Sequence, residues 1–208
     1  MNTNITVRLI SLLIGYCFGC ILTGEIVAYK YTGGSASKVG DTGNPGMANI
    51  MAALGFKPGI TVLIGDLLKC LIAMLIAWKL YGMTGILYAG LGSTIGHDFP
   101  FWRKFRGGKG VATSSLAFLM YSFPLGLVSN IAGMLVVFAT QYLCIGGLVI
   151  PIVFTIGGWL IFGREVGLVG IVYILLAIHS HIGQILKIPS GECSKDDVLG
   201  AIRRKLKK

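Results

Sequence analysis

Residues 99–113, FPFWRKFRGGKGVAT, combine a run of glycines with a cluster of cationic side chains, Arg103, Lys104, Arg106 and Lys109. Glycines let several backbone N–H groups converge on one anion, and a helix beginning just after Gly110 would add the positive end of its dipole. Lys109 would contribute a point charge and Arg106 a bidentate contact. An ordinary basic loop would explain the charges but not the Gly-Gly-Lys-Gly run. We therefore predict a phosphate site in residues 99–110, which we name the cationic loop.

The cationic loop differs from the P-loop of nucleotide triphosphatases. Arg103 stands where the Walker A motif has its first glycine, and Gly110 stands where that motif has Ser or Thr. The physics of phosphate binding still applies, but the spacing excludes a P-loop enzyme.

A second polar segment, GDTGNPGMAN at 40–49, is also rich in glycine and offers hydrogen-bonding side chains at Thr42, Asn44 and Asn49. Such a composition is typical of a plain connecting loop. Because the cationic loop is expected on the same face of the molecule, we favour one site shared by the two glycine-rich segments.

The segment HSHIGQILK, 179–187, ends the last apolar run. His179 and His181 are two residues apart, about 200° around a helix, so only one of them can face the interior. His181 and Gln184 share a face. Taken alone, this histidine more simply caps or hydrogen-bonds the helix end, and catalysis is the alternative.

Asp66 and Lys69 lie three residues apart inside an apolar run. An ionisable pair within a membrane is expensive and indicates a function by default. Mutual neutralisation at i, i+3 is the structural alternative. His97, just before the cationic loop, could face the same site.

The rest of the chain is a series of apolar segments that must hold these residues in a membrane. Only 12% of the 208 residues are charged, about half the usual fraction, and the mean hydropathy is +0.80. Most of the 31 glycines are expected where helix backbones pack closely. We predict a single all-α domain over residues 1–208, a polytopic transmembrane helix bundle. Its expected helices are roughly 5–29, 60–80, 83–97, 110–128, 129–143, 145–162 and 166–187, and five spans with a re-entrant segment are the alternative.

The distribution of Lys and Arg predicts the orientation of the bundle. Loop 30–46, loop 98–109 and the tail 187–208 hold most of the 18 basic residues, and about seven spans would place all three on one face. By the positive-inside rule that face is cytoplasmic and the N-terminus is outside. The basic tail is then a lipid-attracted anchor, and nucleic-acid binding is not expected. Cys17 and Cys20 have no partner pair at metal-ligand spacing, so no metal site or disulfide is assigned.

The string GHDFPFWRKFRGGKGVAT, 96–113, closely resembles the central motif of the bacterial acyl-phosphate-dependent glycerol-3-phosphate acyltransferases, the PlsY-type family. Four further segments resemble that family's motifs in the same order over nearly the whole chain: KVGDTGNPGMAN, GDLLK, TQYLCIGG, and HIGQILKI followed by Glu192. The chain departs from the family pattern at Asp41, Thr42, Met47, Ala48, Gln141, Cys144, Gln184 and Lys187. Of these departures, Gln141 removes a positive charge, because the family has Arg there.

The resemblance implies a divergent membrane acyltransferase that moves a fatty acyl group from acyl phosphate to the 1-hydroxyl of glycerol 3-phosphate, giving lysophosphatidate and phosphate. No cofactor or metal is implied, since acyl phosphate already has a good leaving group. The implied setting is a monomer among the lipids of the inner (plasma) membrane, with its site facing the cytoplasm. The implied catalytic residues are Thr42, Asn44, Lys109 and His181. The implied substrate- and phosphate-binding residues are Lys104, Arg106, Gly107, Gly108, Gly110, Thr113, Asn49, His97, Gln184, Lys187 and Glu192.

The sequence does not identify the base that accepts the hydroxyl proton. His181 is either a general base or a donor that orients a phosphate, and a substrate phosphate could take the proton itself. We expect His181 to position rather than abstract. The His-x4-Asp pair of other glycerolipid acyltransferases is absent, because Trp102, Gln184 and Leu186 occupy the fifth positions after the three histidines.

The alternative function is a non-catalytic membrane binder or transporter of a phosphate-bearing metabolite that uses the same cationic site. Transporters tend to bind at the midplane between repeated halves. Here the polar groups gather on one face and no internal repeat is visible, so the enzyme is favoured.

Overall fold

The computed structural model describes residues 4–193 and 195, and its regular elements over those residues are all helices. These residues form two compact units, one ending at Ser122 and one beginning at Phe123. Five helical segments of the described chain are long and apolar enough to cross a membrane: Ile5–Thr32, Phe56–Arg103, Phe123–Thr140, Leu143–Phe162 and Arg164–Ile185. The predicted all-α membrane fold is confirmed, whereas the number of spans and the side of each terminus stay predictions.

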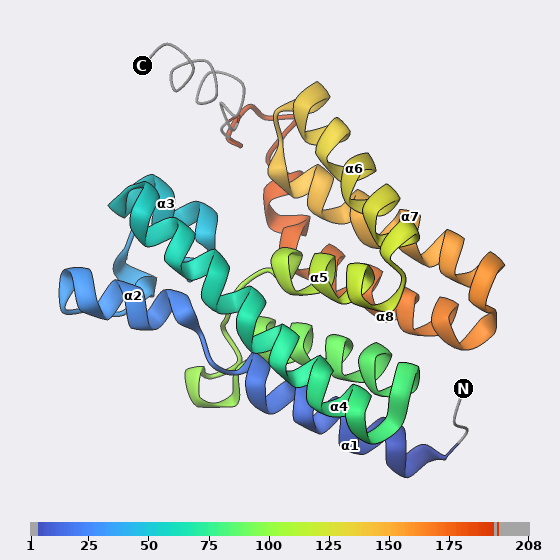
Figure 1. Ribbon diagram of the computed structural model, residues 1–208. Coiled ribbons are helices and arrows are strands. Elements are labelled where there is room, and N and C mark those ends of the chain that lie inside the picture. The colour runs from blue at the N-terminus through green and yellow to red at the C-terminus, as the bar shows by residue number, and fades with distance from the viewer. Residues whose placement is uncertain (1–3, 194, 196–208) are drawn as a thin grey trace. The chain divides into compact units, whose positions relative to one another are not determined.

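The first unit contains five α-helices and two short 3-10 turns (Figure 1). They are α1 (Ile5–Gly19), α2 (Thr23–Thr32), η1 (Ala36–Lys38), α3 (Met47–Leu54), α4 (Phe56–Asp98), η2 (Phe101–Arg103) and α5 (Val111–Tyr121). The helix α3 was not predicted, because it begins inside the polar segment 40–49 and is too short to form a long apolar run.

The helix α4 is a hairpin of two antiparallel arms. Gly82 interrupts it with φ 62° and ψ −143°, a conformation that favours glycine. The backbone of Ala77 lies against Gly85, although eight residues of straight helix would separate them by about 12 Å. The chain therefore reverses at Gly82, as Figure 1 shows. This confirms the predicted helices 60–80 and 83–97.

The helix α1 packs against the second arm of α4 through glycines. Gly15 and Gly19 contact the backbone of Ala89 and Ser93, and a Cβ at either glycine would overlap that backbone. Gly15 lies against Ala89, and Gly19, four residues later, lies against Ser93, four residues after Ala89. The helix α1 and this arm of α4 therefore run parallel. The predicted close packing of helices through glycine is confirmed here. Because α1 and this arm are parallel, the C-terminal ends of α1 and α4 lie at the same end of the unit.

The predicted bounds of three helices are wrong. The expected helix 5–29 is interrupted at residues 20–22, and α2 is a separate helix. The expected helices 110–128 and 129–143 are divided at Ser122 instead, so that α5 is short and α6 begins at Phe123. Pro124 explains the second change, since proline fits the first turn of a helix but breaks its interior.

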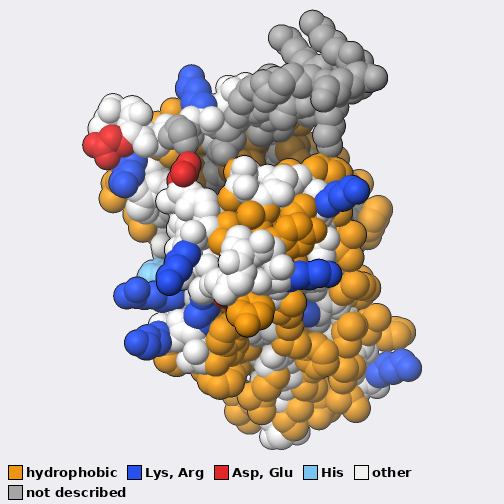
Figure 2. Space-filling view, turned by 90° about the vertical axis from the view of Figure 1, so that its left-hand side faces the viewer, with side chains coloured by type: hydrophobic (Ala, Val, Ile, Leu, Met, Phe, Trp, Pro, Cys, Tyr) orange, Lys and Arg blue, Asp and Glu red, His pale blue; other side chains and the backbone are white. Residues whose placement is uncertain are grey.

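The second unit contains α6 (Phe123–Thr140), α7 (Leu143–Phe162) and α8 (Arg164–Ile185). The helix α7 packs against both α6 and α8. The predicted helices 145–162 and 166–187 agree with α7 and α8 to within about two residues. Large hydrophobic side chains such as Leu160, 79% exposed, and Leu175, 59% exposed, point outward from these helices. Hydrophobic side chains also cover much of the face shown in Figure 2, as expected for a protein surrounded by lipid.

Candidate active site

Three segments of the first unit meet where α1 and α4 end. The Nη2 of Arg103 in the cationic loop lies 2.7 Å from the Oε1 of Glu25 in α2. The same carboxylate accepts hydrogen bonds from the Ser35 hydroxyl and the Ala36 N–H, each 3.2 Å long. The indole N–H of Trp102 donates to the Cys20 carbonyl at 2.8 Å. These contacts hold the cationic loop, α2 and residues 35–36 together, and the backbone of Pro45 in segment 40–49 packs against Gly24 of α2. Both predicted glycine-rich segments therefore contact this part of the unit.

The glycines of the cationic loop hold it on the end of α4. The N–H groups of Gly107 and Gly108 donate to the carbonyls of Asp98 and His97, at 2.9 and 2.8 Å. The expectation that these two N–H groups point at an anion is therefore wrong. A Cβ at Gly108 would overlap the imidazole of His97. These two glycines serve close approach to α4, and an anion would meet the later part of the loop.

The later part of the loop runs directly into α5. Gly110, at φ 66°, is the N-cap of that helix, as predicted. A Cβ there would lie 2.9 Å from a carboxylate oxygen of Asp98, so the junction is closely packed. The hydroxyl of Thr113 donates to the Gly110 carbonyl at 3.0 Å and is buried. Lys109 thus lies between two glycines that are fixed in place.

The tip of the cationic loop is exposed. Lys104 and Phe105 both have positive φ, 52° and 58°, and they lie in the open together with Arg106. Phe101 is 63% exposed. Of the predicted phosphate ligands, Lys104 and Arg106 therefore occupy the exposed part of the loop and Lys109 the packed part.

Asn49 organises the segment 40–49. Its side-chain amide donates to the carbonyls of Val39 and Asn44, at 2.7 and 2.9 Å, and its Oδ1 accepts from the Thr42 N–H at 3.4 Å. Asn44 in turn accepts from the N–H of Gly46 at 2.7 Å, just before α3. The structure gives Asn49 a positioning role, and it leaves the Thr42 side chain exposed.

We expect Asn49→Asp to loosen this segment and to lower the melting temperature of the protein. The new side chain has the same shape but loses two donors, and it turns a carboxylate oxygen toward two carbonyls, so at least two hydrogen bonds of about 1 kcal/mol each are lost. Thermal unfolding and limited proteolysis in detergent would measure both effects. Asp41→Ala, a change at an exposed position of the same segment, is the control. Equal stability of the two variants would contradict the role given to Asn49.

A buried polar cluster lies beneath the cationic loop. The Nζ of Lys69 is 2.9 Å from the Asp66 Oδ1 and 2.9 Å from the His97 Nδ1. The same ammonium donates to the carbonyls of Gly19 and Ile21, at 3.0 and 2.6 Å. His97 thus lies against the Asp66–Lys69 pair, whereas its role in substrate binding stays a prediction.

The second unit holds the remaining predicted residues on and after α8. His181 is 3% exposed, whereas His179 is exposed, so only one of the two faces the interior, as predicted. Gln184 is half-buried on the same helix, and Lys187 and Glu192 are exposed beyond its end. Gln141 ends α6 with φ 62°. The end of the predicted basic tail, residues 196–208, lies outside the described residues.

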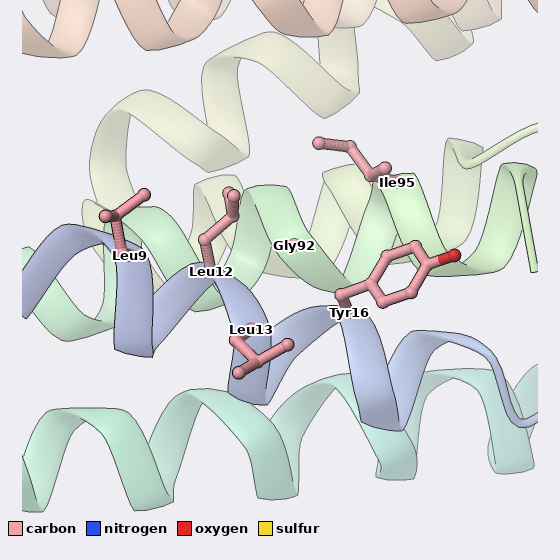
Figure 3. A pocket seen from close by; sticks show the side chains of 6 residues that line it. All are labelled: Leu9, Leu12, Leu13, Tyr16, Gly92 and Ile95. Atoms are coloured by element: carbon pink, nitrogen blue, oxygen red, sulfur yellow. The ribbon is translucent and has the colours of Figure 1, made fainter. Parts of the chain in front are cut away.

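An apolar groove runs along the first unit between α1 and α4. Its volume is about 260 Å³, and Figure 3 shows its lining: Leu9, Leu12, Leu13 and Tyr16 of α1 with Gly92 and Ile95 of α4. The hydroxyl of Tyr16 donates to the Phe99 carbonyl at 3.0 Å. One end of the groove therefore reaches the start of the cationic loop.

The family model described as glycerol-3-phosphate acyltransferase matches residues 9–191. The chain belongs to this family. A glycerol-3-phosphate acyltransferase 1 of Lactobacillus johnsonii is 39% identical over 199 residues, 95% of this chain and 96% of the relative. The resemblance of the central motif is thereby confirmed.

Two solved structures of PlsY, an integral membrane glycerol 3-phosphate acyltransferase, have the same fold. Its glycerol 3-phosphate form matches with a TM-score of 0.82 and 29% identity, covering 94% of this chain and 98% of that one. Its lysophosphatidic acid form matches with a TM-score of 0.79 and 28% identity, covering 90% and 94%. This glycerol-3-phosphate acyltransferase family member is therefore a multi-pass membrane protein.

Sequence reasoning missed three ionisable residues that take part in the contacts around the candidate site. Arg103 was grouped with the cationic loop but given no partner, and Glu25 was not considered. Asp98 was passed over, although it follows His97 directly in the motif. The signal available for Asp98 was its acidic side chain at the end of an apolar run, where ionisable groups are uncommon.

Proposed function

We propose that this chain transfers a fatty acyl group from acyl phosphate to the 1-hydroxyl of glycerol 3-phosphate. Membership of the glycerol-3-phosphate acyltransferase family supports the acceptor and the type of reaction. The observation that carries the proposal is the junction at Lys109, between a glycine packed on His97 and the N-cap of α5. A lysine fixed beside a helix N-terminus suits the binding of a phosphate group.

The reaction needs positioning and electrostatic stabilisation. The 1-hydroxyl oxygen bonds to the acyl carbon, the bond from that carbon to the phosphate oxygen breaks, and inorganic phosphate leaves. Lys109 and the first turn of α5 hold phosphate charge, while Thr42 and Asn44 offer hydrogen bonds to the acceptor. We assign the hydroxyl proton to a phosphate oxygen and give His181 the role of orienting a phosphate.

We place the acyl chain in the groove of Figure 3. Its lining is almost wholly apolar, and the Tyr16–Phe99 hydrogen bond ties one end of it to the cationic loop. A chain lying there would have its reactive end near the loop and its tail along α1.

We expect Leu13→Trp to shift the preference toward shorter acyl phosphates by about tenfold, because the indole would fill part of the groove. Leu13 is 60% exposed, so the larger side chain should leave the helix packing intact. Ratios of kcat/KM for palmitoyl and octanoyl phosphate measure the shift. Leu75→Trp, on the outer surface of α4 at 40% exposure, is the control. An unchanged ratio in Leu13→Trp would place the acyl chain elsewhere.

The orientation of the enzyme follows from its charge. We propose a monomer in the inner (plasma) membrane whose loop-bearing end faces the cytoplasm, with acyl phosphate reaching the site from the surrounding lipid. Lys30 and Lys38 lie at the same end of the first unit as the cationic loop, which supports this orientation through the positive-inside rule. A non-catalytic binder or transporter is not favoured, because the matching relatives bear the acyltransferase name.

The decisive experiment supplies palmitoyl phosphate and glycerol 3-phosphate to the protein in mild detergent or a lipid mesophase. Phosphate release and lysophosphatidate are measured together. Matched production of the two, lost in Lys109→Ala, is the expected result, and this control guards against spontaneous hydrolysis. A folded protein that forms neither product would contradict the proposal.

A further inference from the structure

We propose that Lys69 is a positioning residue that ties the end of α1 to His97 and, through His97, sets the place of the cationic loop. In this view the buried pair does more than neutralise itself. The kinetic part of the test rests on the proposed function, whereas the spectroscopic part does not.

The first step is the direction of the Lys69 donors. An ammonium has three N–H groups, and Lys69 has three hydrogen-bond partners, the carbonyls of Gly19 and Ile21 and the His97 Nδ1. The Oδ1 of Asp66 also lies 2.9 Å from the ammonium and forms an ion pair with it. Neutralisation alone would need only Asp66, yet the ammonium also donates to two carbonyls at the end of α1 and to His97. Lys69 therefore joins two separate parts of the fold.

The second step is the break after α1. The chain leaves the helix at residues 20–22, where backbone carbonyls lack the next turn as a partner. Lys69 satisfies two of these carbonyls, and Trp102 of the cationic loop donates to the Cys20 carbonyl between them. Unsatisfied carbonyls inside a membrane protein cost several kcal/mol each. Lys69 therefore stabilises the turn on which Trp102 is anchored.

The third step is the orientation of His97. Because Lys69 can only donate, the Nδ1 of His97 accepts, and the proton of the neutral ring is on Nε2. That edge of the ring lies against Gly108, where there is no room for a Cβ. Gly108 also donates its N–H to the His97 carbonyl at 2.8 Å. The ring and backbone of His97 together set the position of Gly108, and Lys109 follows directly.

The test removes the positioning contacts without leaving a buried charge. Lys69 and Asp66 are 5% and 3% exposed, so Lys69→Met alone would strand a carboxylate. Replacing both charges by apolar side chains of similar volume avoids a stranded carboxylate, and the carbonyls of Gly19 and Ile21 lose the Lys69 donor. We expect Asp66→Leu/Lys69→Met to keep its helical content but to lose about 100-fold in kcat/KM for glycerol 3-phosphate, mainly through a higher KM, because the loop is misplaced.

Trp102 provides a readout that does not depend on activity. In a Trp78→Phe/Trp159→Phe background it is the remaining tryptophan. We expect the charge-free double variant to increase the quenching of Trp102 fluorescence by acrylamide, since its carbonyl anchor loosens. Unchanged quenching together with an unchanged KM would overturn the proposal. If the parent protein forms no product, the proposed function fails while the fluorescence still decides the positioning role.

A second pair of variants tests the His97–Gly108 contact should the charge-free variant not fold. Gly108→Ala places a methyl group against the imidazole, and His97→Asn keeps an acceptor for Lys69 on a shorter side chain. We expect acrylamide to quench Trp102 fluorescence less in the combined variant than in Gly108→Ala alone. The shorter side chain of His97→Asn makes room for the methyl group. Strictly additive effects of the two substitutions on Trp102 quenching would contradict contact through His97.

Discussion

Lys109→Met should lower kcat/KM for glycerol 3-phosphate by about 100- to 1,000-fold, the range found when a donor to developing charge is removed. Lys109 is half-buried at a junction held on both sides, by the Gly108 contact with His97 and by the N-cap of α5. Water therefore cannot easily replace the lost ammonium, and Met keeps the length of the side chain. Steady-state release of phosphate with palmitoyl phosphate as donor measures the effect.

Two control substitutions separate a local from a general effect of charge. Lys79→Met removes the same charge from an exposed position near the Gly82 reversal, at the other end of the first unit, and should leave kcat/KM within about twofold, as for an isolated surface charge. Lys104→Met removes a charge from the exposed loop tip, and its kcat/KM should lie between those of Lys109→Met and Lys79→Met. If Lys109→Met and Lys79→Met were equally active, the loop–helix junction would not be the phosphate site.

The long helices could be predicted because each apolar run is nearly as long as the bilayer core requires. The second arm of α4, α7 and α8 all follow this rule, and their observed ends differ from the predicted ends by about two residues. The reversal at Gly82 was also readable, since a glycine separates two apolar runs. Local composition is sufficient to predict a helix whose apolar surface is in contact with lipid.

The break after α1 could not be predicted, because its cause is not local. Residues 5–29 read as one apolar helix, yet Lys69 and Trp102, far along the chain, provide the donors that satisfy the carbonyls at residues 19–21. A sequence shows that such a lysine is present but not which carbonyls it meets. The same reason explains why Arg103 was not paired with Glu25.

The residues of the cationic loop were identified more successfully than their contacts. Gly107 and Gly108 were expected to present N–H groups to an anion, but both groups donate to the end of α4. A glycine can allow several N–H groups to converge on an anion, or it can allow two backbone segments to pack closely. The composition of the loop does not show which of these two roles a glycine has. The helix start after Gly110 was predicted correctly, so the surviving hypothesis for phosphate binding is narrower and centres on Lys109.

His181→Ala should lower kcat by about 100-fold or more, with little change in folding. His181 is buried on α8 at 3% exposure, and His179, exposed two residues earlier, is a matched control. His179→Ala should remain within about twofold of the parent, as expected for a surface substitution. Parent-like turnover in His181→Ala would exclude both an orienting role and a general-base role for this residue.

Amide substitutions at His181 distinguish the two roles. Asn places its NH₂ group near the position of Nδ1, and Gln places it near that of Nε2, but neither amide can accept a proton at neutral pH. If His181 orients a phosphate by donating a hydrogen bond, one of the two amides should recover activity to within about tenfold of the parent, since the donor is restored. If His181 is the general base, Asn and Gln should be as impaired as Ala. Because acyl phosphate carries oxygens that can accept the hydroxyl proton, we expect recovery with one amide.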